Sequence, residues 1–186
     1  MISEKVKSIE NKDSYPEISD EVIKLKPFRL EDAERHISGE DESQIKWLSG
    51  GKSTLKDTQN WIRKNLESWQ TGGHVFNFAI WTKEDNLAGM VEANTDNTSI
   101  EGLEEGDANI SYSLYPEARG KGYVTRAVNL LVEFLRGKGV KRAVIRVHPE
   151  NTSSLNIPLR CGFKKVGTIE DKNGNPLSIF VKQLTK

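Results

Sequence analysis

Residues 115–123 read Tyr-Pro-Glu-Ala-Arg-Gly-Lys-Gly-Tyr, and they separate two segments with different hydrophobic periods. In residues 107–114, apolar and polar side chains alternate, which predicts a strand. From Val124 to Leu135, apolar side chains recur every three or four residues, which predicts an amphipathic helix. We therefore expect a short glycine-bearing turn that joins the end of a strand to the start of a helix.

This turn has the chemistry of an anion site. The first turn of a helix presents backbone N–H groups that have no partner within the helix, and the helix dipole adds partial positive charge there. Gly120 and Gly122 carry no Cβ, so a ligand can approach the main chain closely. Arg119 and Lys121 add two positive charges. The combination predicts a site for a phosphate or a pyrophosphate.

Two common nucleotide motifs do not fit these residues. The dinucleotide fingerprint G-x-G-x-x-G needs glycine or alanine where Thr125 stands. Residues 51–53, Gly-Lys-Ser, match the end of an ATP/GTP P-loop, but Lys46 stands in place of its first glycine. The pattern that remains is R/Q-x-x-G-x-G/A at residues 119–124, with Val124 replacing the final small residue.

A second motif follows at residues 151–163, Asn-Thr-Ser-Ser-Leu-Asn-Ile-Pro-Leu-Arg-Cys-Gly-Phe. It resembles the N-x-x-S-x-x-V/I-P/A-x-R/K-x-G-F signature of the ribosomal-protein N-terminal acetyltransferases (RimJ/RimL-like). Together the two motifs resemble the GCN5-related N-acetyltransferase (GNAT) family, and one expected helix and one expected strand separate them, as in that family. The alternative is an ordinary βαβ unit with a glycine turn.

The resemblance implies a GNAT-type acyl-CoA N-acyltransferase fold of the mixed α/β class. Residues 1–20 are expected to form an N-terminal extension, and residues 21–186 a single domain. Hydrophobic patterning predicts a mixed sheet of six or seven strands with helices on both faces. The expected strands are residues 21–27, 75–81, 87–93, 107–114, 142–147, 163–168 and 177–184. The expected helices lie near residue 30, at 53–70, after residue 123 and at 151–160.

The resemblance also implies acetyl-CoA as cosubstrate. Its diphosphate is expected on the loop formed by Arg119, Gly120, Lys121, Gly122, Tyr123 and Val124. Its pantetheine amides are expected to pair with the backbone of Tyr112, Ser113 and Leu114, where the neighbouring parallel strand splays away. Asn151 is expected to form a hydrogen bond near the cofactor. The sequence shows no metal-ligand spacing, so no metal is expected.

Two residues are candidates for proton handling. Glu92 is the best candidate for the general base because it lies on a strand beside the central one. Many relatives use a tyrosine as the acid, but here Pro158 occupies that place. Ser154 matches the serine of the ribosomal-type branch and is the candidate acid or thiolate stabiliser. The alternatives are a solvated carboxylate at Glu92 and a helix-capping role for Ser154.

Composition narrows the partners and the compartment. The formal net charge is zero and no long basic run is present, so neither a nucleic-acid surface nor an anionic-membrane patch is expected. No apolar run approaches the ~18 residues of a membrane span, and residues 1–20 do not resemble a signal peptide. A single cysteine, Cys161, excludes an internal disulfide and is expected to be a buried, inert thiol. These features predict a soluble cytoplasmic protein.

The expected function is therefore transfer of acetyl from acetyl-CoA to a primary amine of a small molecule or a protein N-terminus. The alternative is a non-catalytic acyl-CoA-binding or regulatory module on the same fold. The acceptor region, residues 39–73, carries no recognisable motif. Its acids Glu40, Asp41 and Glu42 favour either a cationic acceptor or a solvated charged loop. The sequence does not reveal the oligomeric state, and a homodimer is left open.

Overall fold

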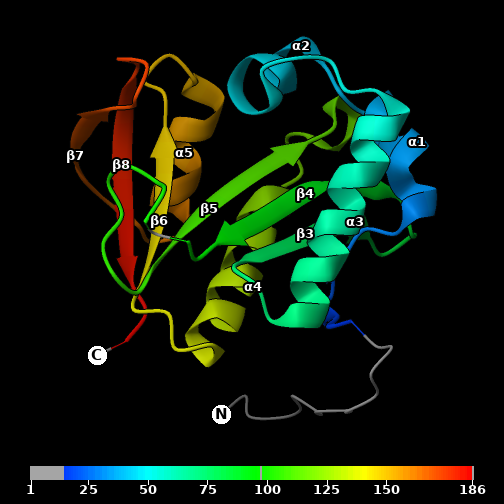
Figure 1. Ribbon diagram of the computed structural model, residues 1–186, viewed down its shortest axis with the longest axis horizontal. Helices are drawn as coiled ribbons and strands as arrows, with labels where there is room; N and C mark the ends of the chain where they lie inside the picture. The colour runs from blue at the N-terminus through cyan, green and yellow to red at the C-terminus, as the bar shows by residue number, and fades with distance from the viewer. Residues whose placement is uncertain (1–14, 97, 186) are drawn as a thin grey trace.

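An eight-stranded mixed sheet runs through the computed structural model, which describes residues 15–96 and 98–185 (Figure 1). Its strands are β1 (Ile18–Ser19), β2 (Ile23–Lys26), β3 (Val75–Thr82), β4 (Leu87–Asn94), β5 (Asp107–Leu114), β6 (Arg142–Val147), β7 (Lys164–Glu170) and β8 (Pro176–Gln183). Its helices are α1 (Ala33–Ser38), α2 (Glu42–Gln44), α3 (Leu55–Thr71), α4 (Tyr123–Gly137) and α5 (Thr152–Arg160). Short 3-10 turns at Leu30–Asp32 and Pro116–Ala118 and a π-helical turn at Ile45–Ser49 complete the elements.

The strands lie in the order β1-β2-β3-β4-β5-β6-β8-β7, and only the β5–β6 pair is parallel. The mixed α/β class is confirmed, but the expected count of six or seven strands was too low. The extra strand is β1, in which Ile18 pairs with Leu25 and Ser19 with Lys24. Two residues are too short to show a period of two in the sequence, so tertiary pairing alone defines this strand.

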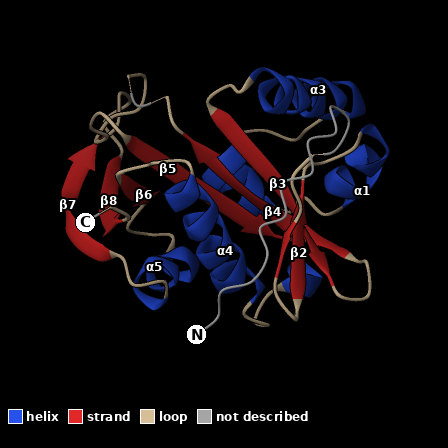
Figure 2. Cartoon of the chain, turned by 90° about the horizontal axis from the view of Figure 1, so that it is seen from below, coloured by secondary structure: helices blue, strands red, loops and turns tan. Residues whose placement is uncertain are grey.

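Helices cover both faces of the sheet, as expected (Figure 2). On one face α4 buries an apolar stripe against β2, β4 and β5, with Val128, Leu131 and Leu135 completely buried. On the other face α3 and α1 pack through Ile62 and Ala33 against Ala79 and Met90 of the sheet. The described residues contain no helix that is both long enough and apolar enough to cross a membrane.

The tryptophans of α3 belong to the core rather than to an acceptor pocket. Trp69 donates a hydrogen bond from Nε1 to the Asn77 carbonyl at 3.1 Å and packs edge-on against Phe76 and Phe78. Trp61 stacks on His36 with ring centroids 5.1 Å apart and an interplanar angle of 16°. Both side chains are partly buried and pack against the core.

A buried polar contact joins α1 to the turn that follows β5. The exposed fraction of His36 is 6%, and its Nδ1 lies 2.8 Å from the hydroxyl oxygen of Tyr115, which is fully buried. Gly39 lies against the same tyrosine, and a Cβ at this glycine would come within 2.3 Å of the ring. Burial lowers the pKa of His36 more than the negative charge of Glu40 raises it. The folded protein therefore keeps this imidazole neutral.

Substitution of His36 tests this burial through the pH dependence of stability. The pKa of His36 is lower in the folded than in the unfolded chain, so the unfolded chain binds more protons as the pH falls. We expect the free energy of unfolding to fall more steeply between about pH 7 and about pH 5 in the native protein than in His36→Gln. Each unit of pKa difference contributes about 1.4 kcal/mol to this change. Urea denaturation at several pH values measures both slopes, and parallel slopes would contradict the prediction.

Candidate cofactor and acceptor site

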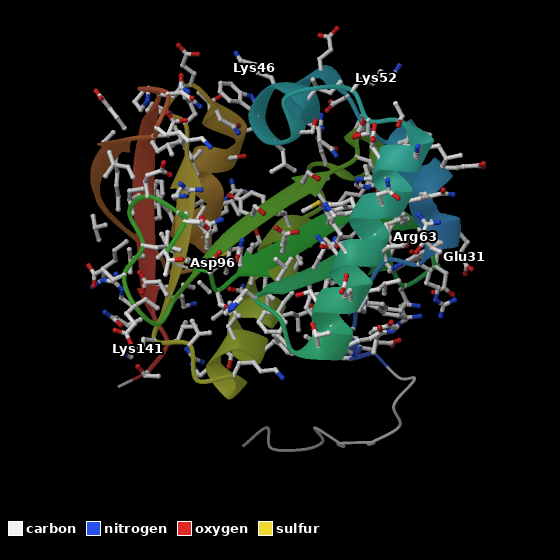
Figure 3. All side chains as sticks on the ribbon, in the orientation of Figure 1. Glu31, Lys46, Lys52, Arg63, Asp96 and Lys141 are labelled. Carbon is white, nitrogen blue, oxygen red and sulfur yellow. The ribbon has the colours of Figure 1, made fainter. Side chains whose placement is uncertain are left out.

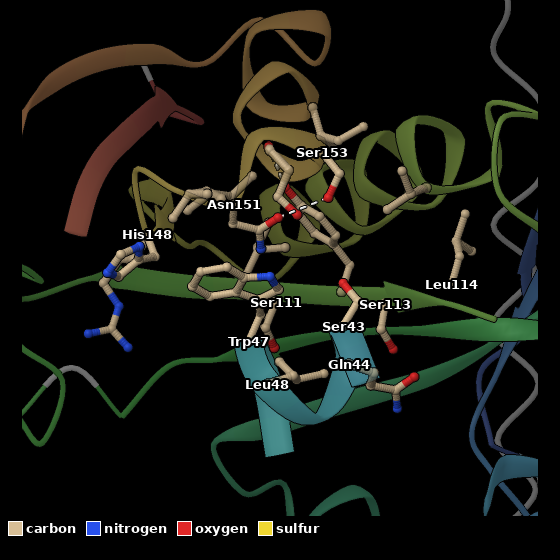
Figure 4. Close-up of a pocket in the computed structure, with 18 of the residues that line it drawn as sticks. Ser43, Gln44, Trp47, Leu48, Ser111, Ser113, Leu114, His148, Asn151 and Ser153 are labelled. Atoms are coloured by element: carbon tan, nitrogen blue, oxygen red, sulfur yellow. Dashed lines mark hydrogen bonds between the residues drawn. The ribbon is translucent and has the colours of Figure 1, made fainter. Parts of the chain in front are cut away.

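The separation of β5 from β6 opens a cavity. The two strands pair only from Asp107 with Arg142 to Ile110 with Ile145, whereas β5 continues to Leu114 alongside β4. Residues 111–114 therefore have a sheet partner on one side only. Beside them lies a cavity of about 700 Å³ that is bounded by β5, β6, α5, the glycine loop and α2 with the turn after it (Figure 4).

Most of the expected site residues lie around this one cavity. Those that line it are Tyr112, Ser113, Leu114, Arg119, Gly120, Val124, Asn151 and Ser154. Lys121, Gly122 and Tyr123 lie in the same loop but are not among the lining residues, and neither is Glu92. Two separate sequence motifs and the end of a strand thus meet at one place, although residues 114 and 151 are far apart in the chain.

The glycine loop leaves room beside its backbone. Gly120 and Gly122 have φ angles of 76° and 78°, which lie in the left-handed region that favours glycine. A Cβ at either position would meet no atom within 4 Å, so the space next to both is open. Gly122 is also the N-cap of α4, and its lack of a side chain leaves the first-turn N–H groups without a side-chain cap. This geometry is suited to a bound phosphate group.

Arg119 makes an additional contact that the sequence did not reveal. Its Nη1 and Nη2 donate to the two carboxylate oxygens of Asp41 at 2.6 and 2.9 Å, and its Nε donates to the Leu114 carbonyl at 3.1 Å. Asp41 also caps α2 by accepting a hydrogen bond from the Gln44 N–H at 3.0 Å. The Arg119 guanidinium holds the pKa of Asp41 below its usual range. Arg119 therefore connects the glycine loop to α2 through Asp41. The sequence had left open whether this acid belongs to a solvated charged loop.

A hydrogen bond joins β5 to the second motif, at a backbone carbonyl that Pro158 leaves without a helical partner. In a helix the N–H of residue 158 would donate to the carbonyl of Ser154, but proline has no N–H. The hydroxyl of Tyr112 donates to this carbonyl instead, at 3.3 Å. Burial raises the pKa of the Tyr112 hydroxyl, which keeps it protonated. At the start of α5, Asn151 accepts a hydrogen bond from the Ser153 hydroxyl at 2.9 Å (Figure 4).

Residues 43–48 form the wall of the cavity opposite α5, which no sequence motif indicated. Ser43, Gln44, Trp47 and Leu48 line it. The ring of Trp47 lies 5.1 Å from the ring of His148, which follows β6, so this wall reaches across to the far strand (Figure 4). The sequence signals were the apolar group Ile45, Trp47 and Leu48 within a polar segment and the family resemblance, which placed this segment in the acceptor region.

Glu92 lies one strand away from the cavity. Its partner across the β4–β5 pair is Ser111, which lines the cavity. Its carboxylate accepts a hydrogen bond from Asn77 Nδ2 at 2.9 Å. Burial raises the pKa of Glu92 by more than this hydrogen bond lowers it. A carboxyl group with a raised pKa is better matched to proton transfer near neutral pH than an exposed one.

The described part of the chain offers neither a metal centre nor a reactive thiol. Within residues 15–96 and 98–185, no group of three or more His, Cys, Asp or Glu side chains is placed to hold a metal ion. Cys161 is buried, and burial raises its pKa to about 11, so the thiol stays protonated. This agrees with its expected role as an inert core residue.

Comparison with known proteins assigns the family. Residues 23–164 match the model of the acetyltransferase (GNAT) domain. The chain therefore belongs to the GNAT acetyltransferase family, as its two motifs predicted, and this places it in the class of acetyl-CoA-dependent acetyltransferases. It is 29% identical over 119 residues to the uncharacterized N-acetyltransferase p20 of Bacillus licheniformis. That match covers 61% of this chain and 64% of the relative, so the chain matches just under two thirds of the relative's length.

Solved structures share the fold. The microcin C7 self-immunity acetyltransferase MccE, in complex with acetyl-CoA and AMP, superposes with a TM-score of 0.74 at 27% identity. That comparison covers 88% of this chain and 93% of MccE. RimL, the ribosomal L7/L12 alpha-N-protein acetyltransferase, in complex with coenzyme A, has a TM-score of 0.74 at 16% identity and covers 90% of this chain and 98% of RimL. Both relatives hold coenzyme A or its acetyl thioester.

Substitution of Gly122 tests the loop as the diphosphate site. We expect Gly122→Asp to raise the dissociation constant for coenzyme A more than about tenfold, because two like charges near 4 Å cost about 1 to 4 kcal/mol in partly solvated surroundings. Isothermal titration calorimetry measures the constant. Gly139→Asp is the matched control, since Gly139 has a φ of 77° and open space around it but does not line this cavity. Equal coenzyme A affinity in the two variants would refute the assignment of the loop.

Proposed function

We propose that this protein is an N-acetyltransferase that moves acetyl from acetyl-CoA directly to a primary amine. The observation that carries the proposal is the separation of β5 from β6 beside an open glycine loop. It leaves the backbone of residues 111–114 beside a cavity that extends from the start of α4 to α2 and β6. Membership in the GNAT family supports acetyl-CoA as the cosubstrate.

The cavity has a place for each part of acetyl-CoA. The diphosphate binds the N–H groups of residues 119–124 at the start of α4, where the helix dipole favours negative charge. The pantetheine amides pair with the backbone of Tyr112, Ser113 and Leu114, on the side that β6 has left. Asn151 contributes a hydrogen bond where the two strands separate. The thioester then lies between β5 and α5, near Ser154.

Transfer requires movement of two protons. The amine nitrogen attacks the thioester carbonyl, a C–N bond forms, and the C–S bond breaks. Glu92 takes the proton that the amine loses, through water, because its carboxyl lies one strand from the cavity wall. Ser154 stabilises the departing thiolate of coenzyme A through its hydroxyl, and a water molecule supplies the proton that completes the thiol. Pro158 stands where many relatives have a tyrosine, so the proton donor in this chain is not that tyrosine.

The free energy needed to deprotonate the amine depends on which acceptor the enzyme uses. An α-amine with a pKa of ~8 is about one-tenth neutral at pH 7, which costs roughly 1.4 kcal/mol. A lysine amine with a pKa of ~10.4 is neutral in only about one molecule in 2,500, which costs roughly 4.6 kcal/mol. A base that acts through water suits the first acceptor better. The relative RimL acts on a protein α-amine, and the complex of MccE contains AMP, so both a protein N-terminus and a small molecule remain candidate acceptors.

The alternative is a non-catalytic acyl-CoA-binding module on the same fold. Two observations favour it: Pro158 replaces the usual acid, and Glu92 does not line the cavity. Incubation with acetyl-CoA and a panel of peptides, amino acid amides, polyamines and aminoglycosides separates the two functions. The proposed enzyme releases coenzyme A thiol with at least one amine, measured with a thiol reagent. Binding of acetyl-CoA without thiol release from any member would support the alternative.

Ser154 is tested by its effect on turnover. We expect Ser154→Ala to lower kcat about tenfold or more, since loss of a proton donor or thiolate partner affects the transition state. The affinity for acetyl-CoA should change little, because the hydrogen bond from Tyr112 uses the backbone carbonyl of Ser154 and not its hydroxyl. Calorimetry gives the affinity and thiol release gives kcat. An unchanged kcat would remove Ser154 from the mechanism.

Glu92 is tested by the pH dependence of the reaction. Glu92→Gln keeps the shape of the side chain and its contact with Asn77 but removes the base. We expect kcat/KM to fall most at low pH and to recover toward the native value as the solution pH approaches the pKa of the amine. Profiles of kcat/KM against pH for both proteins measure this. Profiles that differ by a constant factor would indicate a structural role for Glu92.

A further inference from the structure

We propose that the amine acceptor carries a negatively charged carboxylate or phosphate group, and that Arg146 binds this group at the β6 end of the cavity. The proposal rests on the proposed acetyl transfer and adds the chemical class of the acceptor. It distinguishes anionic acceptors from polycationic ones such as polyamines and aminoglycosides.

The first observation is the charge around the cavity. Among the described residues that line it are three arginines, Arg119, Arg146 and Arg160, together with His148, but no aspartate and no glutamate. A polycationic acceptor would therefore find no carboxylate on the wall. Two acids of the acceptor region are engaged elsewhere, since Asp41 pairs with Arg119 and Glu40 accepts hydrogen bonds from the backbone N–H and the hydroxyl of Ser53.

The second observation is the contrast between two arginines on the same face of β6. Arg142 has a bidentate contact with the buried carboxylate of Asp107, at 2.8 and 2.6 Å, and lies outside the cavity. Four residues on, Arg146 lines the cavity, and its Nε donates to the neutral amide oxygen of Asn109 at 3.0 Å. In the described structure, one carboxylate lies within 4 Å of Arg146, that of Glu101 at 3.6 Å, and its side chain is 41% exposed.

The incomplete pairing of Arg146 suits a ligand anion. Its guanidinium is half-buried, and burial lowers its pKa more than the charges of Glu101 and Asp171 raise it. A partly desolvated arginine gains most from a carboxylate or phosphate that it can grip with two N–H groups. Arg146 Nη1 also donates to the backbone carbonyl of Glu101 at 3.4 Å, but the exposed Glu101 carboxylate competes with a ligand anion only weakly.

The third observation concerns the place for the amine. Gln44 has an exposed fraction of 6% and lines the cavity, and its Oε1 has no hydrogen-bond partner among the described residues. The hydroxyl of Ser113, which also lines the cavity, likewise has no partner there (Figure 4). Buried oxygen atoms without partners are suited to accept hydrogen bonds from a ligand N–H. Both therefore fit the amine end of an acceptor.

The two ends of the proposed acceptor site lie beside two residues of the same strand, β5. Asn109 and Ser113 lie on one face of β5, four residues apart, which corresponds to ~13 Å along a strand. Asn109 holds Arg146, and Ser113 lies near the expected thioester. The site thus fits an extended acceptor with the amine at one end and the negative charge at or near the other.

Matched acceptors test the proposal. The first pair is the C-terminally amidated peptides Ser-Gly-Glu and Ser-Gly-Gln, and the second is the amidated peptides Ser-Gly-phosphoserine and Ser-Gly-Ser, with spermidine as a polycation. We expect kcat/KM to be about tenfold or more higher for the anionic member of at least one pair, through a lower KM. The pair whose anionic member has the higher kcat/KM shows whether the site prefers a carboxylate or a phosphate. Calorimetric binding of the same compounds to the protein–coenzyme A complex gives a readout that does not depend on turnover.

Three variants connect the preference to Arg146. Arg146→Gln should remove the preference by weakening only the anionic member, whereas Glu101→Gln should strengthen that member by freeing Arg146. Arg63→Gln, on the exposed face of α3, removes the same charge far from the cavity and should change neither member (Figure 3). Unchanged thermal denaturation and acetyl-CoA affinity show that each variant is folded.

Two results would overturn the proposal. One is equal binding and equal kcat/KM for both members of each pair in the native protein. The other is an Arg146→Gln variant that weakens charged and neutral members by the same factor. Failure of the acetyl transfer itself looks different: no compound releases thiol, although Arg146-dependent binding of the anionic member to the coenzyme A complex can still be measured and would support the anion site.

Discussion

The separation of two parallel strands is the constraint on which the site depends. While β5 and β6 pair, their backbone groups satisfy each other, and no ligand can enter between them. Beyond Ile110 and Ile145 the strands diverge, and the backbone of β5 keeps only β4 as a neighbour. A polar edge then lies inside the protein, where unmet hydrogen bonds are costly. A ligand that carries amide groups can satisfy that edge and acts as a substitute for the missing strand.

Three contacts hold the walls around this opening. Arg119 joins the glycine loop to the cap of α2, and Tyr112 joins β5 to the Ser154 carbonyl that Pro158 leaves free. Trp47 lies against His148 and brings the segment after α2 to the end of β6. Each contact links elements that are distant in the sequence. The cavity is therefore shaped by contacts that the motifs do not specify, and partners such as Asp41 and Trp47 lie outside both motifs.

The charge of the cavity shows why local composition is a poor guide to a pocket. Glu40, Asp41 and Glu42 form an acidic run, which in isolation suggests a cationic acceptor. In the folded chain Asp41 neutralises Arg119 and Glu40 binds Ser53, so neither presents its charge to the cavity. The described lining is instead basic. Which charges a ligand meets depends on how side chains pair, and pairing partners such as residues 41 and 119 are found only in three dimensions.

The sequence alone determined the class of fold and the family and predicted the cofactor loop, because these follow from local periodicity and from short motifs with fixed spacing. Alternation in residues 107–114, the glycines at 120 and 122 and the motif from Asn151 to Phe163 were sufficient. Only the tertiary structure decided the eighth strand, the partner of Arg119, the distance of Glu92 from the cavity and the exposure of Arg146 to it. These depend on contacts between residues far apart in the chain, which no local pattern encodes.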